Sequence, residues 1–223
     1  MLLRLILNNT EITTEKALVG SATAKVAFVD EKEGLIHLFD GNTAGVIWRR
    51  PMQERVQSWL DALPVDQLPT GRIVLPVSQV RLAVTELLNI SGMPNCAERQ
   101  LFLDDICLLA HEFDELFAPT YLRLRFDVVT TNKCPKFHID HVAARLLCTY
   151  RGVGTEYSFL DDQKRSAEIF PTPNCAAIVF RGTKWPTDCA NNLVHRSPEI
   201  NDANETRLLF VIDPVDDADD KEA

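Results

Sequence analysis

The pattern of apolar and polar residues changes character once along the chain, close to Tyr121. Before that point, three segments keep their apolar residues three or four positions apart. These segments span residues 51–63, 76–92 and 97–117. Such spacing places apolar side chains along one face of a helix, so each segment is predicted to be an amphipathic helix. Pro51 suits the first turn of its helix, and Gly92 suits a helix end.

Short β-favouring runs account for the rest of the pattern. They span residues 25–30, 34–40 and 45–50 near the amino end, and residues 121–129, 144–150, 175–182, 191–197 and 206–213 later. No helical pattern alternates with the later runs, which favours an antiparallel sandwich or barrel over a parallel sheet. We therefore expect one compact α+β domain over residues 1–213, with a mixed half (1–118) and a β-rich half (119–213). An acidic, disordered tail is expected at 214–223.

Composition and charge narrow the possible functions. The chain has 223 residues, of which 46% are hydrophobic and 25% charged, as in ordinary globular proteins. Its net charge is −9; the last ten residues hold five acids and one lysine, which gives −4 and leaves −5 for the rest. This acidic balance, without a basic stripe, argues against a nucleic-acid partner.

The cellular location is predicted from three features that the sequence does not show: a signal peptide, a membrane span and a disulfide framework. The start, "MLLRLILNNTE", has an apolar run that is short for a signal peptide and is interrupted by Arg4. No stretch approaches the roughly 18 apolar residues of a membrane span. The six cysteines form no C-x-x-C pair, so a disulfide framework is not indicated. We expect a cytoplasmic protein with reduced thiols; the oligomeric state stays open.

The candidate chemistry starts in "CPKFHIDHVAARLLCTYRG", residues 134–152. If His138 to His141 are extended, His138 and Asp140 point to one face, while Ile139 and His141 point to the other. His138 and Asp140 then form a chelating pair, and His141 is the weaker candidate ligand. His195, at the end of the apolar run in "NNLVHRSP", is the further histidine of the β-rich half. Two histidines and one carboxylate are the donors of the facial triad that holds non-haem Fe(II).

Arg207 adds a fourth element twelve residues after His195, at the start of "RLLFVID". A guanidinium there could hold a carboxylate through paired, charge-assisted hydrogen bonds. The order His138-x-Asp140, His195, Arg207 resembles that of the Fe(II)/2-oxoglutarate-dependent oxygenases over about residues 120–213. The resemblance implies a double-stranded β-helix, or cupin-like jelly roll. Together with the helices predicted before Tyr121, we expect this fold to have a helical amino-terminal buttress. It also implies Fe(II) on the triad and 2-oxoglutarate with its far carboxylate on Arg207.

A closer likeness is to the bacterial family known as domain of unknown function 1826 (DUF1826). It is similar in residues 134–157 ("CPKFHIDHVAARLLCTYRGVGTEY"), in "GTKWP" and "LVHRSP", and in the amino-terminal "GVIWRRP". This likeness spans most of the chain and implies no activity. The function that we expect, an oxygenase acting on a small-molecule substrate, therefore depends on the ligand pattern.

Two alternatives remain open at this point. One is a non-catalytic metal- or small-ligand-binding cupin-like protein, for example in metal homeostasis. The other is a zinc protein that uses Cys134, because a thiolate suits Zn(II) better than an oxygenase iron. Tyr157 could reach a bound co-substrate or pack in the core, and His111 falls on the polar side of its predicted helix.

Overall fold

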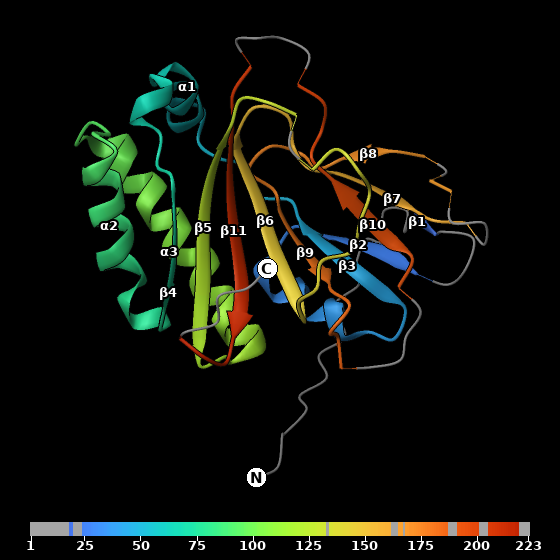
Figure 1. Ribbon diagram of the computed structural model, residues 1–223. Coiled ribbons are helices and arrows are strands. Elements are labelled where there is room, and N and C mark those ends of the chain that lie inside the picture. The colour runs from blue at the N-terminus through green and yellow to red at the C-terminus, as the bar shows by residue number, and fades with distance from the viewer. Residues whose placement is uncertain are drawn as a thin grey trace.

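The computed structural model describes residues 18–19, 24–132, 134–161, 165–166, 168–186, 191–200 and 205–218. Their strands form two sheets (Figure 1). The large sheet has eight strands in the order β1-β2-β3-β9-β6-β11-β5-β4, and the small sheet has three in the order β10-β7-β8. Strands β2 and β3 run parallel, and the other pairs run antiparallel. The antiparallel character expected of the β-rich half is confirmed.

The strands have the following bounds. In the large sheet they are β1 (Leu18–Val19), β2 (Lys25–Val29), β3 (Thr43–Trp48), β4 (Gly71–Leu75), β5 (Tyr121–Val129), β6 (Ala144–Arg151), β9 (Ala177–Arg181) and β11 (Arg207–Val215). In the small sheet they are β7 (Glu156–Phe159), β8 (Phe170–Pro171) and β10 (Leu193–Arg196). The end of β11 lies two residues inside the segment that we expected to be tail.

The helices lie within the predicted segments, but α1 begins at Glu54, so Pro51 precedes the helix and does not start it. They are α1 (Glu54–Ala62), α2 (Val80–Ile90) and α3 (Ala97–Phe117), with the 3-10 helices η1 (Lys32–Phe39), η2 (Val65–Gln67) and η3 (Val77–Gln79). Gly92, just beyond α2, has φ of 71°, a left-handed conformation that glycine adopts without the usual steric cost. The expected helix end is therefore confirmed. His111 on α3 is exposed, as its place in the pattern indicated.

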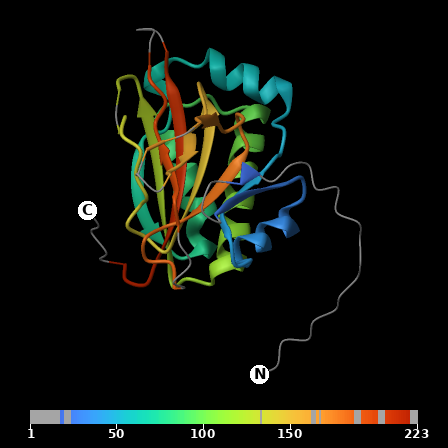
Figure 2. The same cartoon turned by 90° about the vertical axis from the view of Figure 1, so that its right-hand side faces the viewer.

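The large sheet is covered on both faces (Figures 1 and 2). On one face, a single apolar cluster joins the three α-helices to β5, β6 and β11; its members include Val56, Leu88, Phe102, Ile106, Leu124, Leu146 and Phe210. On the other face, a second cluster joins the small sheet to the large one; its members include Tyr157, Phe159, Leu193, Ile47, Ile178, Phe180, Leu209 and Val211. The two sheets thus pack face to face, and the helices pack behind the larger one.

One expected strand is wrong. The run 34–40, "GLIHLFD", belongs to η1 rather than to a strand. Leu35 and Leu38 are its buried residues, three positions apart, whereas an alternating strand would bury Leu35 with His37. Apolar residues in a short segment fit both patterns, and here packing against β3 selects the helical one.

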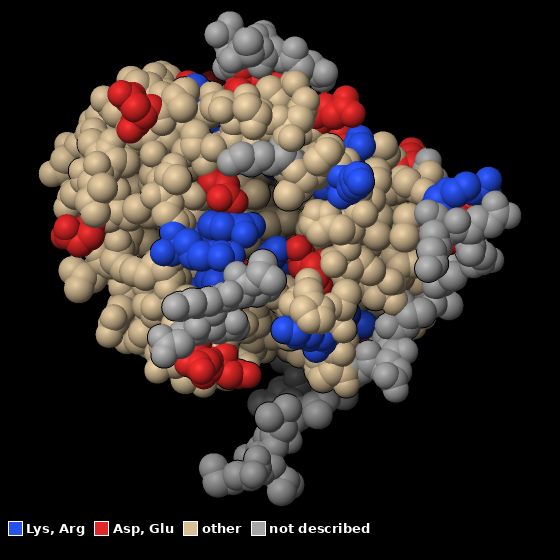
Figure 3. All heavy atoms as spheres, in the orientation of Figure 1, with Lys and Arg blue, Asp and Glu red and all other residues tan. Residues whose placement is uncertain are grey.

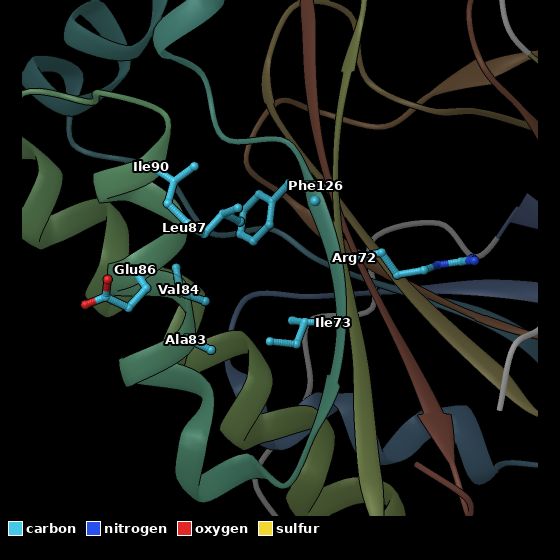
Figure 4. Close-up of a pocket in the computed structure, with 9 residues that line it drawn as sticks. Arg72, Ile73, Ala83, Val84, Glu86, Leu87, Ile90 and Phe126 are labelled. Carbon is cyan, nitrogen blue, oxygen red and sulfur yellow. The ribbon is translucent and has the colours of Figure 1, made fainter. Parts of the chain in front are cut away.

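A hollow of about 240 Å³ lies between α2 and β4, on the helical side of the large sheet (Figure 4). Its wall is mainly apolar, with Ile73, Leu87, Ile90 and Phe126 turned toward it. The histidines discussed below do not line it. No helix in the described part of the chain is both long and apolar enough to cross a membrane.

Candidate metal centre

The side chains of His138, Asp140 and His195 converge. One ligand atom from each lies within 4.8 Å of the others. Nε2 of His195 is 3.0 Å from Oδ2 of Asp140, and Nε2 of His138 is 3.5 Å from Oδ1 of the same carboxylate. The His195 and Asp140 side chains are 7% and 9% exposed, whereas that of His138 is 40% exposed. The arrangement therefore has two buried members and one member at its open side.

Backbone pairing brings the two histidines together. The residues 134–143 form no regular strand, but His138 and His195 form an isolated antiparallel bridge with reciprocal N–H···O distances of 3.0 Å. The His138 ring lies 2.9 Å, at Nδ1, from the carbonyl of Lys136. A proton on Nδ1 makes it the donor to Lys136, so Nε2, the nitrogen that faces Asp140, is the one that a metal could take. His138 and Asp140 point toward the same site, as expected. The expected strand, however, consists of a single bridge between His138 and His195.

The turn after β9 fixes the other member of the motif. The backbone N–H of Thr183 donates to the carbonyl of Asp140 at 2.9 Å, and that of Gly182 donates to Ala143 at 2.9 Å. A Cβ atom at Gly182 would lie 1.9 Å from the carbonyl oxygen of Val142, so the close approach of these two segments requires glycine. The "GTKW" turn therefore holds the Asp140 backbone in place.

The Asp140 carboxylate is also connected to the large sheet. Arg145 on β6 donates from one guanidinium nitrogen to Oδ1 of Asp140 at 2.5 Å, and from two others to Asp213 at 2.6 and 2.8 Å. Asp213 on β11 accepts a further bond from Arg123 on β5 at 3.3 Å. These buried, charge-assisted bonds restrict how the carboxylate can turn.

Protonation of the three groups follows from these contacts. Burial by itself would raise the pKa of Asp140, but the close contacts with the His138 and His195 rings and the charge of Arg145 outweigh burial and lower that pKa. The contact with Asp140 raises the pKa of His138. Burial lowers the pKa of His195 despite the nearby carboxylate. Asp140 is accordingly ionised at neutral pH, and the buried imidazole of His195 favours its neutral form.

The three residues fit a divalent transition metal. Oδ2 of Asp140 is buried and accepts no hydrogen bond of good geometry from the described residues, although Nε2 of His195 is only 3.0 Å away. A buried acceptor without a donor is costly, and a cation would remove that cost. Two imidazole nitrogens and a carboxylate are the donors of non-haem Fe(II) sites and of some zinc sites.

The triad lines a cavity of about 230 Å³ between the two sheets. Arg125, Asp127, Arg145 and Leu209 contribute the wall from the large sheet, and Arg196 and Ser197 contribute the wall from β10 and its end. Figure 3 shows the corresponding face, where Lys and Arg spheres gather beside a hollow. The cavity is thus open to solvent and polar, in contrast to the hollow beside α2.

Arg207 lies directly behind this wall. It is fully buried, and its guanidinium donates to the carbonyl of Val153 at 2.7 Å, to Oγ of Ser197 at 3.3 Å and to Oγ1 of Thr149 at 3.5 Å. Burial lowers its pKa to about 10, against the attraction of Glu205, Asp127 and Glu156, so the group is still charged at neutral pH. The buried guanidinium of Arg207 therefore donates to neutral oxygens. One of these oxygens belongs to Ser197, which lines the cavity.

The other candidates fall in different places. Tyr157 is directly opposite His195 in the β7–β10 pair, but it packs in the second apolar cluster and stacks on Phe170, with ring centroids 5.5 Å apart. Cys134 lines the cavity but is not part of the converging group. His141 points elsewhere, with Nδ1 2.8 Å from Oγ1 of Thr183.

Arg145 and Asp213 were not identified from the sequence as site residues. A signal was available, because each is a charged residue within a mainly apolar strand, in "ARLLCTY" and "RLLFVID". Buried charges are rarely kept unless they are paired, so such positions indicate a partner across the sheet. The described cysteines, which are Cys96, Cys107, Cys134, Cys148 and Cys175, form no disulfide with one another. Cys189 lies outside the described residues.

Comparison with known proteins gives a family and a fold. The sequence profile described as "Protein of unknown function (DUF1826)" matches residues 29–213. No curated protein matches the chain. Among solved structures, dioxygenase for auxin oxidation 1 from Arabidopsis thaliana, in a binary complex with 2-oxoglutarate, is 10% identical with a TM-score of 0.51, covering 86% of this chain and 92% of that one. The rice dioxygenase for auxin oxidation is 13% identical with a TM-score of 0.48, covering 85% and 82%. The Arabidopsis match shows a shared overall fold.

Proposed function

We infer the function from the site itself, because this chain belongs to the DUF1826 family and the description of that family names no activity. The proposed function is Fe(II)/2-oxoglutarate-dependent oxygenation of a small-molecule substrate. The convergence of His138, Asp140 and His195 carries the proposal, since these are the donors that such an iron takes. In this interpretation the two packed sheets are the double-stranded β-helix, and α1 to α3 are its buttress.

Arg207 and Ser197 would bind the co-substrate, with Tyr157 in support. The hydrogen bonds of Arg207 go to neutral oxygens, and Glu205 and other acids attract its charge without a hydrogen bond from it among the described contacts, so a dicarboxylate with one end near the triad would suit its five N–H donors. Ser197, which bonds Arg207 and lines the cavity, would accompany that carboxylate. Tyr157 would act from behind the cavity wall, by fixing the position of β10 opposite His195.

When bound, iron and 2-oxoglutarate would supply oxidative decarboxylation coupled to oxidation of a C–H bond. The residues of the chain would supply position and charge. Asp140, held ionised by its neighbours and fixed by Arg145, would present a carboxylate to the cation. His138 would donate from Nδ1 to Lys136 and keep Nε2 for the metal. The two sheets would limit access of water to the side that His138 leaves open.

A zinc protein using Cys134 is the second candidate, because Cys134 lines the same cavity. Its thiol is not among the converging ligand atoms, which favours the triad. A non-catalytic metal-binding protein would share the triad but would not require a buried arginine behind Ser197.

The deciding experiment is anaerobic reconstitution with Fe(II), followed by titration with 2-oxoglutarate. We expect one iron per chain, a visible absorption band on adding 2-oxoglutarate, and slow succinate formation when air is admitted. Stoichiometric iron with no response to 2-oxoglutarate would indicate the non-catalytic metal protein. Preferential retention of zinc, with protection of Cys134 from alkylation by the metal, would indicate the zinc protein.

A further inference from the structure

One ion pair in the wall of the cavity is held less tightly than the others. Arg125 and Asp127 on β5 both line the cavity, and Oδ2 of Asp127 lies 2.9 Å from Nε of Arg125. That nitrogen nevertheless makes no hydrogen bond of good geometry with any described residue. The two side chains are 28% and 38% exposed, so solvent and a solute can reach both. We call Arg125 and Asp127 the exposed pair.

The other two arginines among the described lining residues have hydrogen-bonded partners. Arg145 donates to Asp140 and Asp213, and Nε of Arg196 donates to Oε2 of Glu156 at 2.7 Å. A solute that took either arginine would have to break charge-assisted hydrogen bonds. An ion pair at a partly exposed position contributes little to stability, so opening the exposed pair costs little. The exposed pair is therefore the pair of charges in this cavity that a ligand can most easily replace.

An apolar floor extends from the exposed pair toward the metal side of the cavity. The residues of β11 directly opposite the pair are Leu209 and Val211, and Val211 is in turn opposite Leu147 on β6. Leu147 and Leu209 line the cavity. Neighbouring strands lie about 4.8 Å apart, so two spacings separate β5 from β6 by about 10 Å. Arg145, which holds the Asp140 carboxylate, lies two residues from Leu147 on the same face of β6.

We propose that the exposed pair binds the charged end of a zwitterionic substrate of about the size of an amino acid. Arg125 would bind its carboxylate, and Asp127 would bind its ammonium group. This inference rests on the proposed function, because it takes the metal side of the cavity as the reacting side. The apolar body of the substrate would lie on Leu147 and Leu209, with its far end toward the triad.

The charge and the size of the cavity both favour such a ligand. A zwitterion replaces one ion pair by two and leaves the net charge of the cavity unchanged. An anion alone would take Arg125 from Asp127, and a cation alone would take Asp127 from Arg125, so each leaves one charge without its partner. The cavity of about 230 Å³ is smaller than the roughly 300–1,000 Å³ of typical ligand sites, which limits the substrate to a small molecule.

The test measures binding by calorimetric titration of the full chain, both metal-free and anaerobically with Fe(II) and 2-oxoglutarate. The zwitterionic probes are L-alanine, L-valine and L-leucine. Their analogues without the ammonium group are propionate, isovalerate and isocaproate, and those without the carboxylate are ethylamine, isobutylamine and isoamylamine. We expect at least one amino acid to bind in both states, about tenfold or more tightly than its two analogues, because each analogue lacks one charge-assisted contact. The inference is overturned if no amino acid binds, or if an analogue binds as tightly as its parent.

Matched variants decide whether the exposed pair is responsible. Arg125→Gln should weaken the amino acid and its carboxylate analogue about tenfold but not the amine, whereas Asp127→Asn should weaken the amino acid and the amine but not the carboxylate. A general loss of structure would weaken both analogues alike. Arg81→Gln, which removes an arginine 2.8 Å from Asp104 and outside the cavity, should leave every affinity within about twofold. Equal effects of the two β5 variants on both analogues, or no effect of either variant, would also overturn the inference.

The same samples separate this inference from the proposed function. Arg125→Gln should retain wild-type affinity for Fe(II) and 2-oxoglutarate, since the proposed function assigns neither of them to the exposed pair. If the wild type fails to bind 2-oxoglutarate, the oxygenase function fails, and the titrations of metal-free protein still decide whether the exposed pair binds zwitterions.

Discussion

Replacing Arg207 with methionine tests the step that distinguishes an oxygenase from a metal-binding protein. Methionine keeps much of the apolar stem but removes the charge and the donors to Val153, Ser197 and Thr149. Truncating one member of a buried charge pair costs about 3–5 kcal/mol. Each 1.4 kcal/mol is tenfold in affinity, so 2-oxoglutarate should bind roughly two to three and a half orders of magnitude more weakly.

The fold should tolerate this change. The Val153 carbonyl loses its donor, which costs about 1–3 kcal/mol, but the desolvation penalty of a buried guanidinium disappears as well. Thermal unfolding and iron content should therefore stay close to those of the wild type. Because the triad residues are unchanged, a loss of iron would show that Arg207 shapes the fold and not the co-substrate site.

Arg151→Met is the matched control. Arg151 on β6 also donates to a backbone carbonyl, that of Leu63 at 2.7 Å, but on the helical side of the sheet. Calorimetric titration of anaerobic, Fe(II)-loaded protein should show near-normal 2-oxoglutarate binding for this variant. Normal binding by Arg207→Met, or no binding by the wild type, would refute the assignment of Arg207.

The remaining predictions concern the metal. His138→Ala and Asp140→Ala should each abolish stoichiometric metal binding after anaerobic reconstitution, whereas His141→Ala should mostly spare it; equal loss at His141 would contradict the triad. Cys134→Ser should leave metal affinity within a few-fold, and a loss of orders of magnitude would reveal a thiolate ligand. Arg145→Met should weaken metal binding by about 10–100-fold, as is typical for partners that orient a ligand; a competition titration with a chelator would detect it.

The ligands could be predicted from the sequence because two of them share one short motif. Separation by a single residue places His138 and Asp140 on one side of any extended backbone, and this requires only a local conformation. The structure retains that conformation over a single bridge, where His138 pairs with His195. The third ligand was identified by its order in the chain, and its proximity to the others depends on long-range pairing that no local pattern encodes.

Local sequence patterns did not predict where the amino-terminal strands lie in the large sheet. Strands β2 and β3 extend one end of the large sheet through β9, while β4 forms the opposite edge beside β5. The run "GRIVL" of β4 lies between Pro64 and Pro69 on one side and Pro76 on the other. Proline favours turns, so this short run was not predicted to be a strand. This strand pairs with β5 over Gly71 to Leu75, which places Arg72 directly opposite Arg125. All three of these strands belong to the predicted domain, but long-range packing determines which strands they pair with.

The candidate centre depends on how the two sheets pack, not on either sheet alone. Asp140 is tied to the large sheet through Arg145, whereas His195 belongs to the small sheet and draws His138 to it through the bridge. Phe180, on β9 of the large sheet, stacks on the His195 ring with centroids 4.5 Å apart and planes 12° apart. The packing between the sheets therefore orients the His195 imidazole, on the small sheet, against the Asp140 carboxylate, which Arg145 ties to the large sheet. A metal at this point would bind residues from both layers at once, so its affinity and the packing of the sheets must be thermodynamically linked.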